Sequence, residues 1–262
     1  MPTSAQTLRS MTIVLPAYNE AKRIGPALDE LFGYLGSQPT DLSTDGVPRV
    51  DVLVVDDGSA DETAALVGAR PEAVGTIQEP PTLVVLTVPH AGKGAAVRAG
   101  MLAARGDLVI FADADMATPP SELPKLVQAL TTADVALGSR IQPDGTDMRA
   151  TQPRYRRALG GLFHFLASIW VVGDVKDTQA GFKGFTREAA QDLFRLQRIT
   201  SIVFDVELIH LARRRGYRIA VVPIRWEDVR GSRMRPGARL ALQVAWDLFR
   251  IPLLHRSVRK RR

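Results

Sequence analysis

Residues 50–61, VDVLVVDDGSAD, decide the fold, because they join an apolar β-rich run, an acidic turn and the start of a helical pattern. Similar apolar runs recur along the first half of the chain, and most precede a helical pattern. We expect strands at residues 11–15, 50–55, 83–88, 108–112 and 135–138, and helices at 21–35, 61–68, 92–105 and 121–130. Apolar strands that alternate with helices are typical of right-handed βαβ units whose sheet is covered on both faces. The sequence therefore predicts an α/β fold with a mostly parallel sheet flanked by helices.

Polar stretches separate some of these elements. Residues 36–49, 71–81 and 141–155 lack an apolar period and are rich in turn-forming or charged residues, so we expect surface loops there. We expect residues 1–235 to form one domain and residues 236–262 to form an amphipathic, basic C-terminal helix and tail.

The amino-acid composition limits the kinds of catalytic and metal sites that the protein can form. With 262 residues, 45% of them hydrophobic and 24% charged, the chain is typical of a globular protein. It contains no cysteine, which excludes disulfides, thiolate metal sites and thiol nucleophiles. Its four histidines are His90, His164, His210 and His255, and no pair has metal-ligand spacing. A bound metal ion must therefore rest mainly on oxygen ligands.

The charge is distributed unevenly along the chain. Residues 1–150 carry 11 Lys and Arg against 19 Asp and Glu, a net charge of −8. Residues 151–262 carry 23 Lys and Arg against 9 Asp and Glu, a net charge of +14. An acidic front half and a strongly basic back half indicate an anionic partner.

Two apolar segments lie in the basic half. Residues 159–172, LGGLFHFLASIWVV, fall short of the roughly 18 residues that a membrane span requires. Residues 238–256 place Leu240, Val244, Leu248 and Ile251 on one helical stripe, and Arg259, Lys260, Arg261 and Arg262 follow. We expect peripheral binding to an anionic membrane surface, on the cytoplasmic inner face because no signal peptide is recognisable. The tail lacks interleaved aromatic residues, so we expect no nucleic-acid binding.

Polar residues cluster where three expected strands end. Residues 16–20 (PAYNE) follow the first strand, residues 56–61 (DDGSAD) the second, and residues 113–115 (DAD) the fourth. Ligands of open parallel sheets bind at the carboxyl ends of the strands, so these turns predict a site. Asp113 and Asp115 suit a hard divalent ion that bridges a diphosphate, although a solvated turn is the alternative. Asn19, Ser59 and Asp61 also fit helix caps, and we interpret Asp61 as structural.

A glycine-rich segment, HAGKG at residues 90–94, opens the expected helix at 92–105. It offers backbone amides or the ammonium of Lys93 to a phosphate, but it is too short for a P-loop. A glycine-rich turn into a helix is an equally good interpretation.

The motifs PAYNE (16–20), VDDGSAD (55–61), GKGAAVR (92–98) and DAD (113–115), in this order, resemble the family 2 glycosyltransferases of GT-A fold. The resemblance continues through GSR (138–140), DTQAGFK (177–183), FDVEL (204–208) and GSR (231–233). The last three motifs are similar to the polyprenyl (dolichyl) phosphate hexosyltransferases, closest to the dolichyl-phosphate glucosyltransferase branch. The resemblance covers about residues 11–235.

This resemblance implies a role for each matching residue. The implied donor-binding residues are Pro16, Ala17, Tyr18, Glu20, Asp56, Asp57, Lys93, Asp113, Ala114, Asp115, Gln179 and Arg233. Asp113 and Asp115 would bind Mg²⁺ or Mn²⁺, and the implied catalytic residues are Asp115, Arg140, Asp205 and Arg233. Arg233 would neutralise the leaving diphosphate, at a position where the family more often has lysine.

The resemblance also implies the substrates. The stretch DADMAT (113–118), with Thr118, is similar to the glucosyl branch, whereas mannosyl members commonly have DADLQ. UDP-glucose is therefore the expected donor, and GDP-mannose the alternative. The implied acceptor is polyprenyl phosphate, which is already ionised and needs little help from a base, so direct displacement would give a β-linked product. A hydroxyl acceptor is the alternative, with Asp205 or Glu207 as base, and a homo-oligomer remains open.

Overall fold

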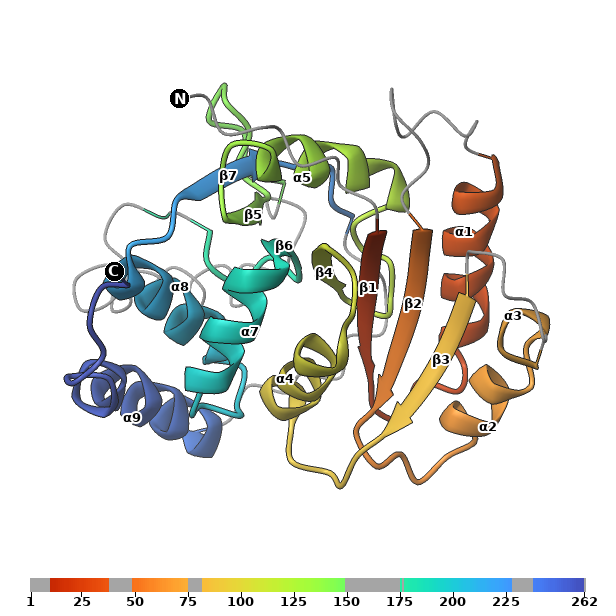
Figure 1. Ribbon diagram of the computed structural model, residues 1–262. Coiled ribbons are helices and arrows are strands. Elements are labelled where there is room, and N and C mark those ends of the chain that lie inside the picture. The colour runs from red at the N-terminus through yellow and green to blue at the C-terminus, as the bar shows by residue number, and fades with distance from the viewer. Residues whose placement is uncertain are drawn as a thin grey trace.

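The computed structural model describes residues 10–37, 49–74, 82–148, 175, 177–227 and 238–261. Within them, seven strands form one sheet in the order β3-β2-β1-β4-β6-β5-β7, with helices on both faces (Figure 1). The strands are β1 (Ser10–Ala17), β2 (Arg49–Asp56), β3 (Thr82–Thr87), β4 (Leu108–Ala112), β5 (Val135–Ser139), β6 (Phe182–Thr186) and β7 (Ile219–Pro223). The helices are α1 (Ile24–Ser37), α2 (Thr63–Gly68), α3 (Pro71–Val74), α4 (Lys93–Ala103), α5 (Leu123–Leu130), α7 (Arg187–Leu196), α8 (Phe204–Arg215) and α9 (Ala238–Leu254), with a 3₁₀ turn, η1, at Pro120–Glu122.

The predicted mostly parallel sheet is confirmed, with one strand in the opposite direction. Strands β3, β2, β1 and β4 run parallel, and β5 pairs with β7 in parallel. Strand β6 lies antiparallel between β4 and β5. Its sequence, FKGFT, carries a lysine and a glycine in its middle and does not look like an apolar strand. For this reason β6 was not predicted from the sequence.

Another difference lies in the stretch 71–81, which we expected to be a loop. Pro71–Val74 forms the short helix α3, with proline at its first position. The side chain of Arg70 bonds Glu72 there and reaches Asp29 of α1. The expected apolar segment at 159–172 and the Gly231-Ser232-Arg233 motif lie outside the described residues.

The sheet separates two cores, as expected for strands buried on both faces. Every residue of β4 is buried. Val109 and Phe111 point into one core with α4, α7 and α8, and Leu108, Ile110 and Ala112 point into the other with α1 and α5. This burial holds the carboxyl end of β4 rigidly, so the Asp113–Asp115 turn starts from a fixed point.

The C-terminal segment packs against the rest of the fold. Leu248 and Ile251 of α9 are buried and Val244 is half-buried, all against the core on the side of α8. This is the stripe predicted from the sequence, and it faces the protein interior rather than a membrane; the side chain of Leu240 lies outside the description. No helix among the described residues is long and apolar enough to cross a membrane.

The tail after α9 is tied to α8. His255 is buried, and its Nε2 lies 2.6 Å from Oε1 of the fully buried Glu207. The guanidinium of Arg214 donates to the carbonyl oxygens of Arg256 and Val258, and that of Arg215 donates to Arg259. The tail is therefore a structural part of the fold.

This packing predicts that His255 stabilises the whole domain. The substitution His255→Ala is expected to lower the free energy of unfolding by roughly 3 kcal/mol, because it leaves a cavity and removes a hydrogen bond from the buried Glu207 carboxylate. Urea unfolding followed by circular dichroism measures the change. Ser257→Ala, an exposed position two residues further on, is the control and should leave the midpoint unchanged. Equal midpoints for both variants would contradict a structural tail.

Candidate functional site

The turns that follow β1 and β2 are joined by hydrogen bonds. The Asn19 amide donates to Ser59 Oγ at 2.8 Å, and the Ala60 amide donates to Asn19 Oδ1 at 2.8 Å. The Glu20 amide donates to Thr63 Oγ1 at 2.7 Å. Asn19 adopts a φ of 53°, in the left-handed region that asparagine tolerates best among the larger residues. The polar residues of these two turns thus hold the rim of the site together.

Asp61 belongs to the same network. Its carboxylate accepts from the amide of Thr63 at 3.0 Å, at the start of α2, and from the amide of Ala21 at 3.2 Å. The N-cap position of α2 is Glu62, which makes no side-chain cap bond, so the predicted cap at Asp61 is wrong, although Asp61 binds two backbone amides of these turns.

Asp57 organises the glycine-rich segment before α4. Its two carboxylate oxygens accept from the amides of Ala91 at 2.9 Å and Gly92 at 3.0 Å, and Oδ2 lies 2.9 Å from His90 Nδ1. The Gly94 amide donates to Thr200 O at 2.9 Å. These three amides are therefore used within the protein and are not available to a phosphate.

Gly94 has a steric reason to be glycine. A Cβ built on it lies 2.8 Å from Thr200 O and 2.9 Å from Phe204 Cβ. Any larger residue would push α4 away from the loop before α8 and displace Lys93.

Asp56 presents an acceptor that the protein leaves unsatisfied. Its side chain is 2% exposed, and Oδ2 accepts from the Ser59 amide at 3.2 Å. Its Oδ1 atom is buried without a hydrogen-bond partner in the part of the chain that the structure describes. An orphaned buried acceptor is costly, so it suits a donor group from a ligand.

Tyr18 lies close to this acceptor, because Ala17 and Asp56 are register partners in β1 and β2. The ring of Tyr18 is 41% exposed and stacks on the His90 imidazole, with ring centroids 4.1 Å apart and an interplanar angle of 17°. An exposed aromatic face beside a buried acceptor is suited to a planar heterocycle.

The Asp113–Asp115 turn follows β4 and meets the lysine of α4. Lys93 Nζ lies 2.5 Å from Asp113 Oδ1. Burial lowers the pKa of Lys93, but the charges of Asp113, Asp205 and Asp115 outweigh this effect and hold the pKa above its ordinary value. Burial and the Asp113 charge raise the pKa of Asp115. Asp113 and Asp115 are carboxylates held close to each other, so their combined charge attracts a cation. In this structure the Lys93 ammonium supplies that positive charge.

Gly181 makes room for this arrangement. The Asp113 amide donates to Gly181 O at 2.9 Å, and a Cβ on Gly181 would lie 1.9 Å from Asp113 Oδ2. A side chain at position 181 is therefore incompatible with this Asp113 rotamer.

A second ion pair lies beneath the turn. Lys183 of β6 is fully buried, and its Nζ donates to Asp205 Oδ1 at 2.8 Å and to Ala180 O at 2.6 Å. Asp205 is 4% exposed. Burial raises its pKa, against the lowering effect of the Lys183 and Lys93 charges. Lys183 belongs to the motif at 177–183, but no role was predicted for it, because no local signal shows that it is buried.

Arg140, after β5, is held by a bidentate contact. Its Nε and Nη2 donate to Asp177 at 2.8 Å and 2.7 Å, and its backbone amide donates to the same carboxylate at 2.8 Å. The guanidinium lies 5.5 Å from the centre of the Trp226 ring. Gln179 is partly exposed in the turn between Asp177 and β6.

The other residues expected in the site make fewer contacts or lie outside the described residues. Glu20 forms a bidentate pair with Arg23, with distances of 2.6 Å and 2.7 Å. Pro16 and Ala17 end β1, and Ala114 is buried between the two aspartates. Arg233 lies outside the described residues.

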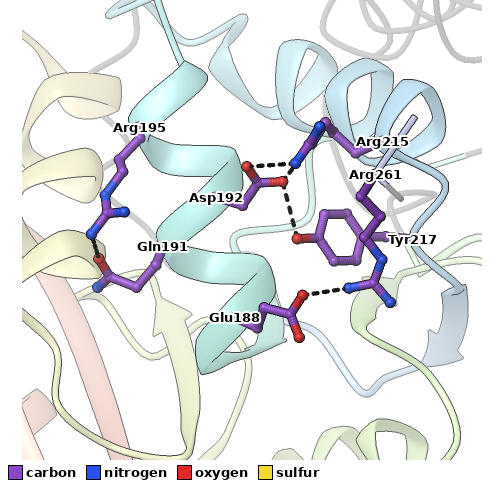
Figure 2. Close-up of a pocket in the computed structure, with 7 residues that line it drawn as sticks. All are labelled: Glu188, Gln191, Asp192, Arg195, Arg215, Tyr217 and Arg261. Atoms are coloured by element: carbon purple, nitrogen blue, oxygen red, sulfur yellow. Dashed lines mark hydrogen bonds and ion pairs between the residues drawn. The ribbon is translucent and has the colours of Figure 1, made fainter. Parts of the chain in front are cut away.

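A different pocket, of about 550 Å³, lies between α7, the residues around Tyr217 and the tail (Figure 2). Its charged side chains largely pair with one another: Arg215 Nε bonds Asp192 at 2.6 Å, and Arg261 bonds Glu188 at 2.7 Å. Burial, together with Asp192, raises the pKa of Tyr217 to about 12. We interpret this pocket as the surface that holds the tail.

The site chemistry fits a nucleoside diphosphate and a divalent ion. Asp56 and Tyr18 offer an acceptor and a ring to a base, and Lys93 offers a charge to phosphates. Among the described residues, no group of three or more His, Cys, Asp or Glu side chains is arranged to hold a metal ion. Asp113 and Asp115 supply two carboxylates, so a bound ion would take further oxygen ligands from a diphosphate and water.

The fold and this site together define a glycosyltransferase of the GT-A class. The family model described as glycosyl transferase family 2 matches residues 12–194, and the chain belongs to this family.

Similar proteins with known names agree with this assignment. A dolichyl-phosphate beta-glucosyltransferase of Trichomonas vaginalis is 38% identical over 94% of this chain and 72% of its own length. The dolichyl-phosphate beta-glucosyltransferase of Drosophila melanogaster is 36% identical over 92% of this chain and 74% of its own. Glucosyl-3-phosphoglycerate synthase from Mycobacterium tuberculosis, solved with Mn²⁺, uridine diphosphate and glucosyl-3-phosphoglycerate, is 25% identical. It superimposes with a TM-score of 0.60 over 95% of this chain and 81% of that structure.

The Lys93–Asp113 contact predicts competition between the lysine and a metal ion. In Lys93→Met, Mn²⁺ alone should bind several-fold more tightly, because the ammonium no longer neutralises Asp113, whereas UDP should bind more weakly. Electron paramagnetic resonance of free Mn²⁺ measures the first change and calorimetry the second. Lys22→Met, which removes an exposed lysine just before α1, is the control. Unchanged or weaker Mn²⁺ binding by the Lys93→Met variant would count against this competition.

Proposed function

We propose that this protein transfers glucose from UDP-glucose to polyprenyl phosphate, with inversion at the anomeric carbon, to give a β-linked lipid-phosphate sugar. The observation that carries the proposal is the rim formed by Asp56, Lys93, Asp113 and Asp115, which suits a nucleoside diphosphate. The names of the relatives above, whose similarity spans more than nine-tenths of this chain, support glucose and a dolichyl-type acceptor.

The donor would bind along the carboxyl ends of β1, β2 and β4. Asp56 Oδ1 accepts from an N–H of the base, Tyr18 packs on the base or ribose, and Asp57 keeps the His90–Gly92 segment in place. Lys93 contacts the diphosphate. Asp113 and Asp115 would hold Mg²⁺ or Mn²⁺, which offsets the negative charge that develops on the leaving diphosphate.

The reaction needs no proton transfer when the acceptor is a phosphate. A phosphate oxygen forms the new bond to the anomeric carbon, the bond from that carbon to the diphosphate breaks, and UDP leaves with the electron pair. The protein has mainly to orient the two anions and neutralise their charges. In this proposal Arg140 and Arg233 supply positive charge, Arg140 by exchanging part of its contact with Asp177.

The position of Asp205 favours a phosphate acceptor over a hydroxyl. A general base must reach the proton that it removes. Asp205 is almost fully buried and accepts a hydrogen bond from Lys183, so we assign it to holding Lys183 and the turn at Ala180. Glu207 is fully buried, with its oxygens bonded to two backbone amides and His255.

The nature of the acceptor also indicates where the protein acts. Polyprenyl phosphates reside in membranes, so we propose that the protein acts as a peripheral protein on the cytoplasmic face, with the basic half of the chain toward anionic lipid.

Transfer of label tests the function directly. The protein, Mg²⁺, labelled UDP-glucose and polyprenyl phosphate should yield label in the organic phase. Asp115→Asn should lower turnover by about 10²-fold or more, because a metal-binding carboxylate is lost, and excess EDTA should abolish it. Glu30→Gln, on the exposed side of α1, is the control. Full activity in EDTA would refute the metal, and label in water-soluble products alone would refute the lipid acceptor.

Donor choice is tested by competition. UDP should displace a fluorescent uridine nucleotide at a lower concentration than GDP, because the Asp113–Thr118 stretch is similar to the glucosyl branch. UDP-glucose should also outcompete GDP-mannose in the transfer assay. Tighter binding of GDP would reassign the donor to the mannosyl type.

A further inference from the structure

The outer face of α9 carries large apolar side chains that are half or more exposed. Leu242 is 72% exposed, Trp246 60%, Phe249 50% and Leu253 56%. Their spacing of four, three and four residues places them on one face of the helix. The rings of Trp246 and Phe249 stack, with centroids 6.1 Å apart. These side chains do not contribute to the hydrophobic core, so the stability of the fold does not explain why they are apolar.

The same helix has a second apolar face that accounts for its attachment. Val244, Leu248 and Ile251 point to the opposite side and pack on the core. Helix α9 is thus apolar on two opposite sides, of which one is buried and the other is exposed.

The charged residues of α9 and the tail are almost all positive. Asp247 is the one acidic residue in the sequence from 238 to 261, and it is 3% exposed, with bonds to Ser201 Oγ at 2.6 Å and Arg250 at 3.0 Å. The tail adds the exposed cations Arg256, Arg259 and Lys260, and α8, which packs against α9, adds Arg213 and Arg214. A helix and tail with an exposed apolar stripe, several cations and a single, buried carboxylate match the composition of helices that bind anionic bilayers in the interfacial plane.

We propose that the outer face of α9, formed by Leu242, Trp246, Phe249 and Leu253, docks the protein on an anionic bilayer. This inference rests on the proposed function, for which it names the surface that meets the membrane. A second copy of the chain is a poorer occupant, because pairing of this face with itself brings the flanking cations together.

Helix α9 is also linked to the candidate site. Asp247 bonds Ser201, and the neighbouring Thr200 accepts from the Gly94 amide, next to Lys93. In Figure 1, α9 and the carboxyl ends of β1, β2 and β3 both lie toward the bottom of the molecule. A bilayer against α9 is therefore on the side of the molecule where a membrane-embedded phosphate has to meet the donor.

Vesicle binding by the full chain tests the docking face. Vesicles of phosphatidylcholine with about 30% phosphatidylserine and no polyprenyl phosphate should bind the protein at low salt. The double variant Trp246→Ser, Phe249→Ser should lower the partition coefficient about tenfold or more. The control, Leu66→Ser with Val74→Ser, removes two exposed apolar side chains on α2 and α3 and should bind like the unaltered protein. Circular dichroism melting confirms that the variants fold.

Charge substitutions separate the two contributions. Arg259→Gln with Lys260→Gln should weaken binding to the anionic vesicles and leave the weaker binding to pure phosphatidylcholine unchanged. The docking proposal is overturned if the Trp246→Ser, Phe249→Ser double variant binds vesicles as well as the unaltered chain. It is also overturned if the unaltered chain binds no vesicles but forms a dimer that the double variant abolishes.

Acceptor length distinguishes this proposal from the function on which it rests. The double variant should keep its activity on a short, water-soluble isoprenyl phosphate and lose it on polyprenyl phosphate embedded in vesicles. Equal loss on both acceptors would overturn the docking role. If the unaltered chain glycosylates neither acceptor yet binds vesicles through α9, the docking face stands and the proposed function fails.

Discussion

The arrangement of the candidate site depends on two lysines that neutralise the acidic end of the sheet. Lys93 of α4 pairs with Asp113, and Lys183 of β6 pairs with Asp205. Several carboxylates brought to one buried rim repel one another and would take up protons if no cation lay near them. Lys183 reaches this place because β6 enters the sheet antiparallel to β4, where Lys183 is the register partner of Phe111. Its Nζ lies 5.3 Å from the centre of the Phe111 ring.

Close backbone contacts keep these charges in position. Gly94 allows α4 to begin against Thr200 and Phe204, and Gly181 allows Asp113 to lie against the loop that leads into β6. The loop between α7 and α8 is held in turn by Glu207, which accepts from the amides of Arg198 and Ile199. His255 reaches Glu207 from the far end of the chain. The C-terminal segment therefore supports the same loop that positions Lys93.

The two apolar faces of α9 show how one helix serves both stability and binding. The inner face completes the core, and the only acid of the segment is used inside the protein to hold Ser201. The outer face retains exposed apolar groups, and the tail that follows it is rich in cations. Since the inner contacts fix the orientation of the helix, the outer face has a fixed direction relative to the candidate site.

The sequence by itself determined the α/β class, the strands of the first half and the acidic turns at their ends. Residues 11–15, 50–55 and 108–112 each fall within an observed strand, because apolar runs bounded by turn residues are local signals. Tertiary structure alone decided that β6 enters the sheet, that Asp205 pairs with the buried Lys183, and that Leu248 and Ile251 face the core. The residues next to a charged side chain in the sequence do not show which group it will pair with. In the same way, the sequence of a helix that is apolar on two sides does not show which side will face the core. That partner is set by packing between segments far apart in the chain, where burying an unpaired charge is too costly to persist.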